Sequence, residues 1–116
     1  MVSADAGRVI ALADSVMGGG ERRLGQALLA NFLRLLGEPK AAPVKAVVCY
    51  NEGVKLVIDD SPVLAHIRAL EAAGVPVVVC RTCVEYFDLE DRLVAGRLSN
   101  MREIQGLMMA HPVVLP

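Results

Sequence analysis

The sequence predicts an α/β domain, a three-layer sandwich in which helices cover both faces of a mainly parallel sheet. Short apolar runs alternate along the chain with longer segments whose apolar residues recur at helical spacing. The run Val75 to Cys80 is apolar throughout, as expected of a strand that is covered on both faces. With 116 residues, of which 54% are hydrophobic, the chain is expected to form one domain, residues 1–116, around a single core.

The first half of the chain predicts two strands with a long helix between them. Arg8 to Ala13 is an apolar run that ends at a glycine-rich loop, so it is expected to be a buried strand. From Glu21 to Leu36 apolar residues recur every three or four positions, and a glycine and a proline then end the pattern. Val44 to Tyr50 is the second predicted strand, and a short helical turn is expected at Val54 to Ile58.

A second helix and a third strand follow. Ser61 suits the N-cap of the helix, and Gly74 suits the left-handed residue just past its end. Val75 to Cys80 is the third strand. After it, the segment from Arg81 to Phe87 predicts a loop that runs into a short helix.

The end of the chain predicts one more helix and one more strand. A short helical segment is expected at Glu90 to Val94. Asn100 stands three residues before Glu103, which is a capping-box signature and opens a helix. Pro112 to Leu115 is the last predicted strand. Right-handed crossovers between these strands place the helices on both faces of the sheet.

The composition argues against several kinds of partner. The net charge is −1, with no Trp, two Tyr and two Phe, so the chain lacks the basic patch and the stacking aromatics of a nucleic-acid-binding protein. Its apolar runs are far shorter than the roughly 18 residues of a membrane-spanning helix. Asp5 and Arg8 interrupt any secretory signal, and three cysteines are an odd number for a disulfide framework. We therefore expect reduced thiols in the cytoplasm, with no membrane and no nucleic acid as partner.

Chemistry is expected where the strands end, because open α/β sheets bind ligands beyond the carboxyl ends of their strands. Four segments lie there: residues 14–20, 49–53, 80–83 and 99–100. The third contains Cys80 and Cys83, and a helix N-terminus and Arg81 would favour the thiolate of Cys83. Alternatively the two cysteines only pack, or they hold a metal with ligands from another chain. No metal site is expected in the chain itself, since it has no second cysteine pair and His66 and His111 lack ligand spacing.

A glycine triplet lies at the end of the first strand. Gly18, Gly19 and Gly20 would let the backbone hold an anion at the N-terminus of the long helix. They match neither the dinucleotide fingerprint nor the P-loop pattern. A plain flexible turn is an equal alternative.

The remaining candidates surround the thiols. Asn51, Lys55 and Arg81 are candidates for binding an anion or a substrate, although exposed cations are usually only solvated. Cys49 also ends a strand, and core packing is the more common role of such a residue. No cofactor is expected.

Six short motifs of the sequence occur in an order that is typical of a known protein family. They are Asp14 to Gly18, Glu21 to Gly25, Tyr50 to Leu56, Ser61 to Leu64, Cys80 to Cys83 and Ser99 to Met101. Together they resemble the DsrE-like domain of the YedF family over nearly the whole chain. This resemblance implies a parallel sheet of about five strands between helices, and a sulfurtransferase-like role.

The resemblance also implies roles and partners. In related DsrE and TusD subunits a cysteine at the end of the corresponding strand accepts sulfur as a persulfide, and that position is Cys80 here. Cys83 is then an extra thiol. Such relatives form trimers and hexamers, so a homo-oligomer is expected. YedF proteins usually carry an N-terminal TusA-like domain that this sequence lacks, so either a TusA-like sulfur carrier is a separate partner chain or the protein has lost that domain.

We therefore expect a sulfur- or selenium-handling carrier that works by a cysteine persulfide relay. In this hypothesis Cys80 is the acceptor, and Cys83 resolves or shares the bound chalcogen. One alternative is a dithiol oxidoreductase that uses the same pair, which a readily formed disulfide would favour. Another is a non-catalytic ligand-binding or assembly module, which solvent-inaccessible sulfurs would favour.

Overall fold

Five strands form one sheet in the computed structural model, which describes residues 7–116. Residues 1–6 of the expected domain lie outside the described residues. The strands pair in the order β4-β3-β2-β1-β5, and every pair is parallel. Their bounds are Arg8–Leu12 (β1), Val44–Cys49 (β2), Val77–Cys80 (β3), Arg97–Ser99 (β4) and Val113–Val114 (β5). The predicted α/β fold with a parallel sheet of five strands is confirmed.

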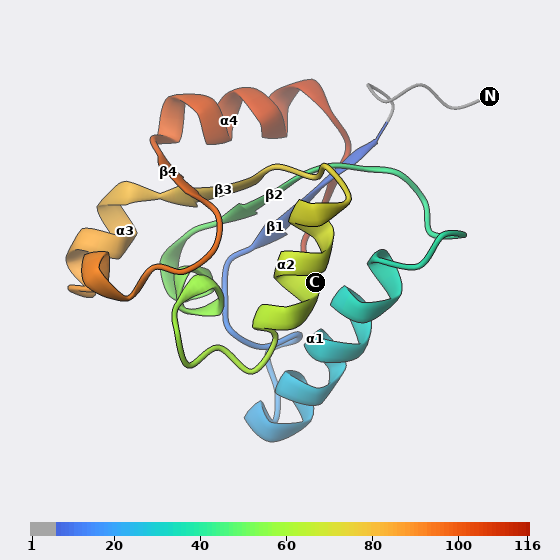
Figure 1. The fold of residues 1–116 in the computed structure, drawn as a ribbon, viewed down its shortest axis with the longest axis horizontal. Helices are drawn as coiled ribbons and strands as arrows, with labels where there is room; N and C mark the ends of the chain where they lie inside the picture. The colour runs from blue at the N-terminus through green and yellow to red at the C-terminus, as the bar shows by residue number, and fades with distance from the viewer. Residues whose placement is uncertain (1–6) are drawn as a thin grey trace.

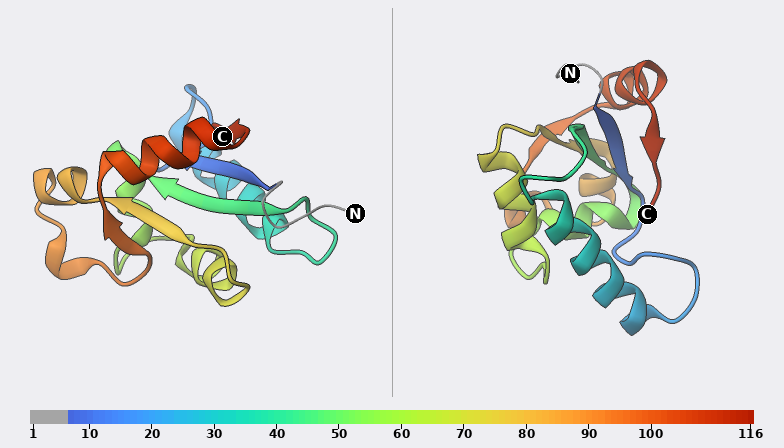
Figure 2. Two further views of the ribbon diagram at one scale, coloured as in Figure 1. Left: turned by 90° about the horizontal axis from the view of Figure 1, so that it is seen from above. Right: turned by 90° about the vertical axis from the view of Figure 1, so that its right-hand side faces the viewer.

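Helices cover both faces of this sheet. Figures 1 and 2 show α4 on one face and α1 with α2 on the other, which makes three layers. The α-helices are Arg22–Leu36 (α1), Leu64–Ala72 (α2), Arg81–Tyr86 (α3) and Met101–Ala110 (α4). Two short 3-10 helices are Asn51–Val57 (η2) and Glu90–Arg92 (η3). Glu21 is the N-cap of α1, and Gly74 has the expected left-handed backbone, with a φ of 93°.

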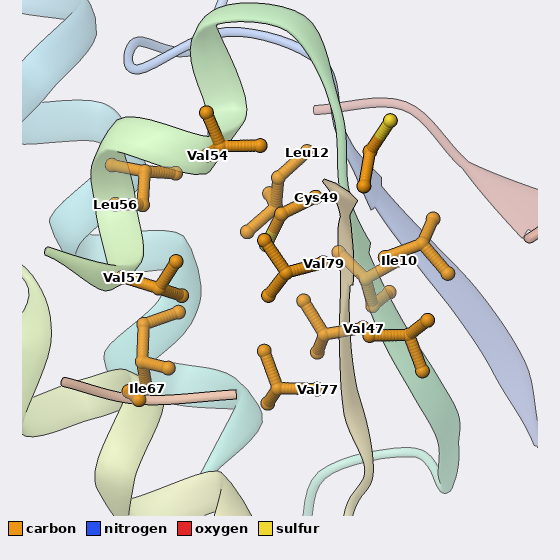
Figure 3. Close-up of a cluster of buried hydrophobic side chains, with 14 of the residues drawn as sticks. Ile10, Leu12, Val47, Cys49, Val54, Leu56, Val57, Ile67, Val77 and Val79 are labelled. Atoms are coloured by element: carbon orange, nitrogen blue, oxygen red, sulfur yellow. The ribbon is translucent and has the colours of Figure 1, made fainter. Parts of the chain in front are cut away.

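The core is built from the buried apolar runs of the central strands β1, β2 and β3. Leu12, Cys49 and Val79 are neighbours across three strands, and all three are buried. Figure 3 shows them pointing toward Val54 and Val57 of η2. Both faces of the sheet are covered, and this explains why the buried positions of β1, β2 and β3 form continuous apolar runs rather than alternating ones.

Two elements differ from the sequence-based expectation. The strand β4 was not predicted, because Arg97–Ser99 is a short edge strand with exposed and half-buried residues rather than an apolar run. The loop expected after Cys80 is absent, since α3 begins at Arg81, directly after the last residue of β3. The other strands and helices have the predicted type, with ends that shift by one or a few residues.

Glu103 joins α4 to the edge strand β4. Its carboxylate accepts hydrogen bonds from two guanidinium nitrogens of Arg97, at 2.7 and 2.6 Å, and from the hydroxyl of Ser99. The side chain of Asn100 accepts from the backbone N–H of Glu103 at 3.0 Å, which is one half of the predicted capping box. The other half is replaced, because the carboxylate binds Arg97 and Ser99 instead of returning to the N-cap.

The glycine of the Asn51-Glu52-Gly53 phrase allows two backbone segments to touch. A Cβ at Gly53 would lie 1.8 Å from the carbonyl oxygen of Leu12, at the end of β1. The N–H of Tyr50 donates to that same oxygen at 3.1 Å. Only glycine therefore permits η2 to lie directly on the end of β1.

We predict that Gly53→Ala destabilises the protein by about 2 kcal/mol or more, because the added methyl group must push η2 off β1. Gly20→Ala is the matched control, since no atom lies within 4 Å of a Cβ at that position. Urea unfolding of the two variants checks the difference. Equal midpoints for Gly53→Ala and Gly20→Ala would contradict the proposed contact.

The Arg97–Glu103 ion pair is expected to make the folding stability of the protein depend on pH in the acidic range. Hydrogen bonds from Arg97 and then Ser99 lower the pKa of Glu103 from 4.5 to about 2. A depressed folded-state pKa stabilises the protein above pH 4.5, and this contribution is lost as the pH falls toward 2. We expect Glu103→Gln to flatten this part of the pH–stability curve. Glu90→Gln, at an exposed carboxylate without an ion pair in the described structure, should leave the curve unchanged.

Candidate functional site

Cys80 and Cys83 lie at the carboxyl edge of the sheet, one at the end of a strand and one in the helix that follows. Cys80 is the last residue of β3 and the N-cap of α3, and Cys83 is the third residue of that helix. The Cys80 thiol neighbours that of Cys83 and raises its pKa. No disulfide links them, and both are free thiols in this structure.

A pocket of about 330 Å³ opens beside the second thiol. Its walls are Asn51 from η2 and, from α3 and its end, Thr82, Cys83, Tyr86 and Phe87. The two aromatic rings meet edge to face, with centroids 5.2 Å apart. The half-buried Cys83 is the only cysteine among these lining residues, so its sulfur is the one that a molecule in this pocket would meet.

The backbone of Asn51 donates a hydrogen bond to this sulfur. The distance from its amide nitrogen to the Sγ of Cys83 is 3.1 Å. Asn51 has a φ of 51°, a left-handed conformation that asparagine tolerates better than most residues. The contact joins the first residue of η2 to α3, across 32 positions of the sequence.

Burial and the neighbouring thiol together decide how readily Cys83 ionises. Burial raises the pKa of Cys83, the hydrogen bond and the charge of Cys80 raise it further, and the N–H of Asn51 lowers it in part. The sequence predicted a stabilised thiolate at the start of a helix. The structure gives the opposite direction: burial raises the pKa of Cys83 most, and Cys80 raises it further, although Cys83 lies in the first turn of α3.

The other two cysteines are buried. Cys80 is 4% exposed and is not among the residues that line the pocket, whereas Cys49 is 0% exposed in the core. Burial, followed by the charge of Glu71, raises the pKa of Cys49 to about 12. Cys49 therefore packs as an apolar residue, and this agrees with the more common role considered from the sequence.

The candidate cations differ in their position. The ammonium of Lys55 lies 4.6 Å from the centre of the Phe87 ring and 2.6 Å from a carboxylate oxygen of Glu52. Lys55 therefore contacts Phe87, a lining residue, without lining the pocket itself, and the Glu52 carboxylate compensates much of its charge. Arg81 is exposed and does not line the pocket.

The glycine triplet is not brought to this pocket. Gly18, Gly19 and Gly20 form an exposed part of the loop between β1 and α1, and none of them lines the pocket. Figure 1 shows the start of α1 well apart from α3. The carboxylate of Glu21 accepts the N–H of Leu24 at 2.6 Å, so this helix N-terminus already has an acidic cap. Anion binding there stays a prediction.

Sequence reasoning did not name three walls of the pocket: Thr82, Tyr86 and Phe87. A signal was present, because Tyr86 and Phe87 stand three and four residues after Cys83. Residues at this spacing share a face of a helix. The acidic, aromatic segment that follows Cys83 therefore supplies two of the lining residues of the pocket, Tyr86 and Phe87.

Residues 7–116 contain no group of three or more His, Cys, Asp or Glu side chains that could hold a metal ion. Among the helices of the same residues, none is long and apolar enough to cross a membrane.

Comparisons with known proteins agree with this fold and cover almost the whole chain. The crystal structure of the ychN protein from E. coli superposes with a TM-score of 0.65 at 18% sequence identity, over 95% of this chain and 99% of that one. No curated protein matches the sequence. The profile of the DsrE/DsrF-like family matches residues 3–111. The chain therefore belongs to the DsrE/DsrF-like family.

Proposed function

We propose that this protein is a carrier in a sulfur relay, and that it holds sulfur as a persulfide on the Cys80–Cys83 pair. The proposal rests mainly on the placement of Cys83. Cys83 lines an open pocket, its sulfur accepts a hydrogen bond from the N–H of Asn51, and the Cys80 thiol is its neighbour. The family is linked in general to sulfur relay, which supports the proposal.

The unequal burial of the two thiols suggests an order of events. The family resemblance makes Cys80 the acceptor, but Cys80 is almost fully buried. Cys83 is more exposed and faces the pocket. We propose that Cys83 meets the sulfur donor first and that Cys80 acts second.

The proposed chemistry needs one thiolate and a donor of the persulfide class. The thiolate of Cys83 attacks the terminal sulfur of the donor R–S–SH. A new S–S bond forms on Cys83, the S–S bond of the donor breaks, and the donor leaves as the thiolate R–S⁻. If the thiolate of Cys80 then attacks the inner sulfur of this persulfide, a Cys80–Cys83 disulfide forms and HS⁻ leaves.

The contact between the thiols also favours a second function, a dithiol oxidoreductase. The two cysteines are three positions apart at the junction of β3 and α3, and the Cys80 thiol influences the pKa of Cys83, so we propose that the pair can close to a disulfide. In this function the pair would exchange two electrons with a dithiol or disulfide substrate and would retain no sulfur. The experiment below separates the two functions by the mass of the product.

We predict that a small-molecule persulfide adds one sulfur atom to the protein, and that the adduct is removed by a reductant. Trypsin cuts after Arg81, so peptides of residues 69–81 and 82–92 report Cys80 and Cys83 separately. We expect the added sulfur on Cys83 at early times, and a loss of at least tenfold in loading for Cys83→Ser. Intact mass and peptide mapping measure both.

Cys49→Ser is the matched control, because Cys49 is buried in the core and should take no part. Full loading of Cys83→Ser would overturn the proposed order and return the acceptor role to Cys80. A Cys80–Cys83 disulfide without any retained sulfur, even at early times, would support the oxidoreductase. If no cysteine changes mass, the non-catalytic module is favoured.

Three further features belong to the proposal. A reducing cytoplasm suits a protein with free thiols, and we propose that location. We also propose a TusA-like protein as the exchange partner and a place near the YedF branch of the family. Selenium is a second possible cargo, and the peptide masses of the loading experiment distinguish a selenium adduct from a sulfur adduct.

We propose a homo-oligomer, a trimer or a hexamer, because α1 exposes a stripe of leucines. Leu24, Leu28 and Leu35 are exposed, and their spacing places them along one side of this helix. We predict an assembly larger than a monomer by light scattering at micromolar concentration, and a smaller one for Leu28→Lys. Gln26→Lys, on an exposed position outside this leucine stripe, should leave the mass unchanged. A monomeric wild-type protein would refute the proposal.

A further inference from the structure

Asn51 contacts the sulfur of Cys83 through its backbone, and this contact depends on an unusual conformation. The residue has a φ of 51°, and its amide nitrogen lies 3.1 Å from Sγ. The N–H of the preceding residue, Tyr50, donates to the carbonyl oxygen of Leu12, so the N–H of Asn51 is the next backbone donor along the chain. The φ of residue 51 sets how η2 continues from this amide, so an ordinary extended or right-handed conformation would turn η2 relative to the N–H and to α3.

We propose that Asn51 is a positioning residue for Cys83: its left-handed backbone holds one N–H on the sulfur, and this hydrogen bond stabilises the anionic form that accepts sulfur. A charge-assisted hydrogen bond to an anion is stronger than one to the neutral thiol, so the contact favours ionisation. The inference rests on the proposed function for its biological role. The effect on the thiol itself does not require a sulfur donor.

The groups that surround Cys83 leave this N–H as the principal stabiliser of a negative charge. Cys80, at the end of β3, repels a second thiolate. Tyr86 of α3 lines the pocket, and on η2 the cation of Lys55 is bound to Glu52. The lowering of the Cys83 pKa by Asn51 agrees with this geometry.

The test compares variants that keep or lose the left-handed conformation. Asn51→Gly keeps it at no steric penalty, whereas Asn51→Val opposes it, because a β-branched residue strongly disfavours positive φ. Rates of alkylation by iodoacetamide are measured from pH 6 to pH 11 on the tryptic peptide of residues 82–92, which contains Cys83 alone. We expect Asn51→Val to raise the apparent pKa and to slow the reaction at neutral pH by about threefold to tenfold, the size of one hydrogen bond. Asn51→Gly should stay within about twofold of the wild type.

Asp88 provides a matched control for backbone strain. It has a φ of 58° at the end of the same helix, but its N–H donates to the carbonyl of Glu85 and not to a sulfur. Asp88→Val should therefore leave the pH profile of Cys83 unchanged. If Asp88→Val shifts the profile as far as Asn51→Val does, the effect is a general loosening of α3, and the proposal fails.

Two other outcomes also overturn it. An equal shift in Asn51→Gly and Asn51→Val would assign the effect to the lost side chain. An unchanged or lower pKa in Asn51→Val would show that the N–H does not stabilise the anion. If Asn51→Val does not fold, as judged by urea unfolding, Asn51→Ala gives the same comparison with a smaller left-handed penalty. Sulfur loading is scored separately, so a shifted profile without any loading refutes the proposed function and leaves the positioning role intact.

Discussion

The contact between the backbone of Gly53 and the carbonyl oxygen of Leu12 is the constraint on which the candidate site depends. A Cβ would lie 1.8 Å from that oxygen, so η2 lies on the end of β1 only because residue 53 has no side chain. This placement puts the first residue of η2 against α3, where the N–H of Asn51 reaches Cys83. A chain reversal directly after β2 thus supplies a backbone donor to a helix that follows β3. The site consists of main-chain geometry as much as of side chains.

The electrostatics of the pocket are governed by burial more than by charge. Lys55 is bound to Glu52, and Arg81 is exposed and does not line the pocket. Burial is the largest influence on the pKa of Cys83, and the N–H of Asn51 opposes it only in part. A donor protein that covers the pocket would bury the thiol further and would raise its pKa again. A donor with a cation beside the sulfur would offset this effect, so the charge of the donor surface matters for the reaction.

The sequence predicted most of the fold and the centre of the site. Four of the five strands were found because each is a run of apolar residues, and both cysteines were found because they follow such a run. β4 was missed, since Arg97–Ser99 lies at an edge and needs no apolar alternation. The walls at Thr82 and Phe87 were missed for another reason. Helical spacing places Phe87 on the face of Cys83, but the contact of this face with η2 joins segments 32 positions apart, and no local pattern encodes that contact.

The sign of the Cys83 pKa shift shows why a motif alone could not describe the chemistry. A Cys-x-x-Cys phrase at the start of a helix suggests a lowered pKa. Here burial raises the pKa of Cys83 most, and the hydrogen bond and the charge of Cys80 raise it further, so the thiol form of Cys83 is favoured. In the proposed relay, the thiolate of Cys83 attacks the sulfur of the donor, and the neighbouring Cys80 thiol is an adjacent acid for the departing donor thiolate. A pair of equally ionised cysteines would attack as well but would lack that proton. The proximity that opposes full ionisation thus gives the pair both a nucleophile and an acid.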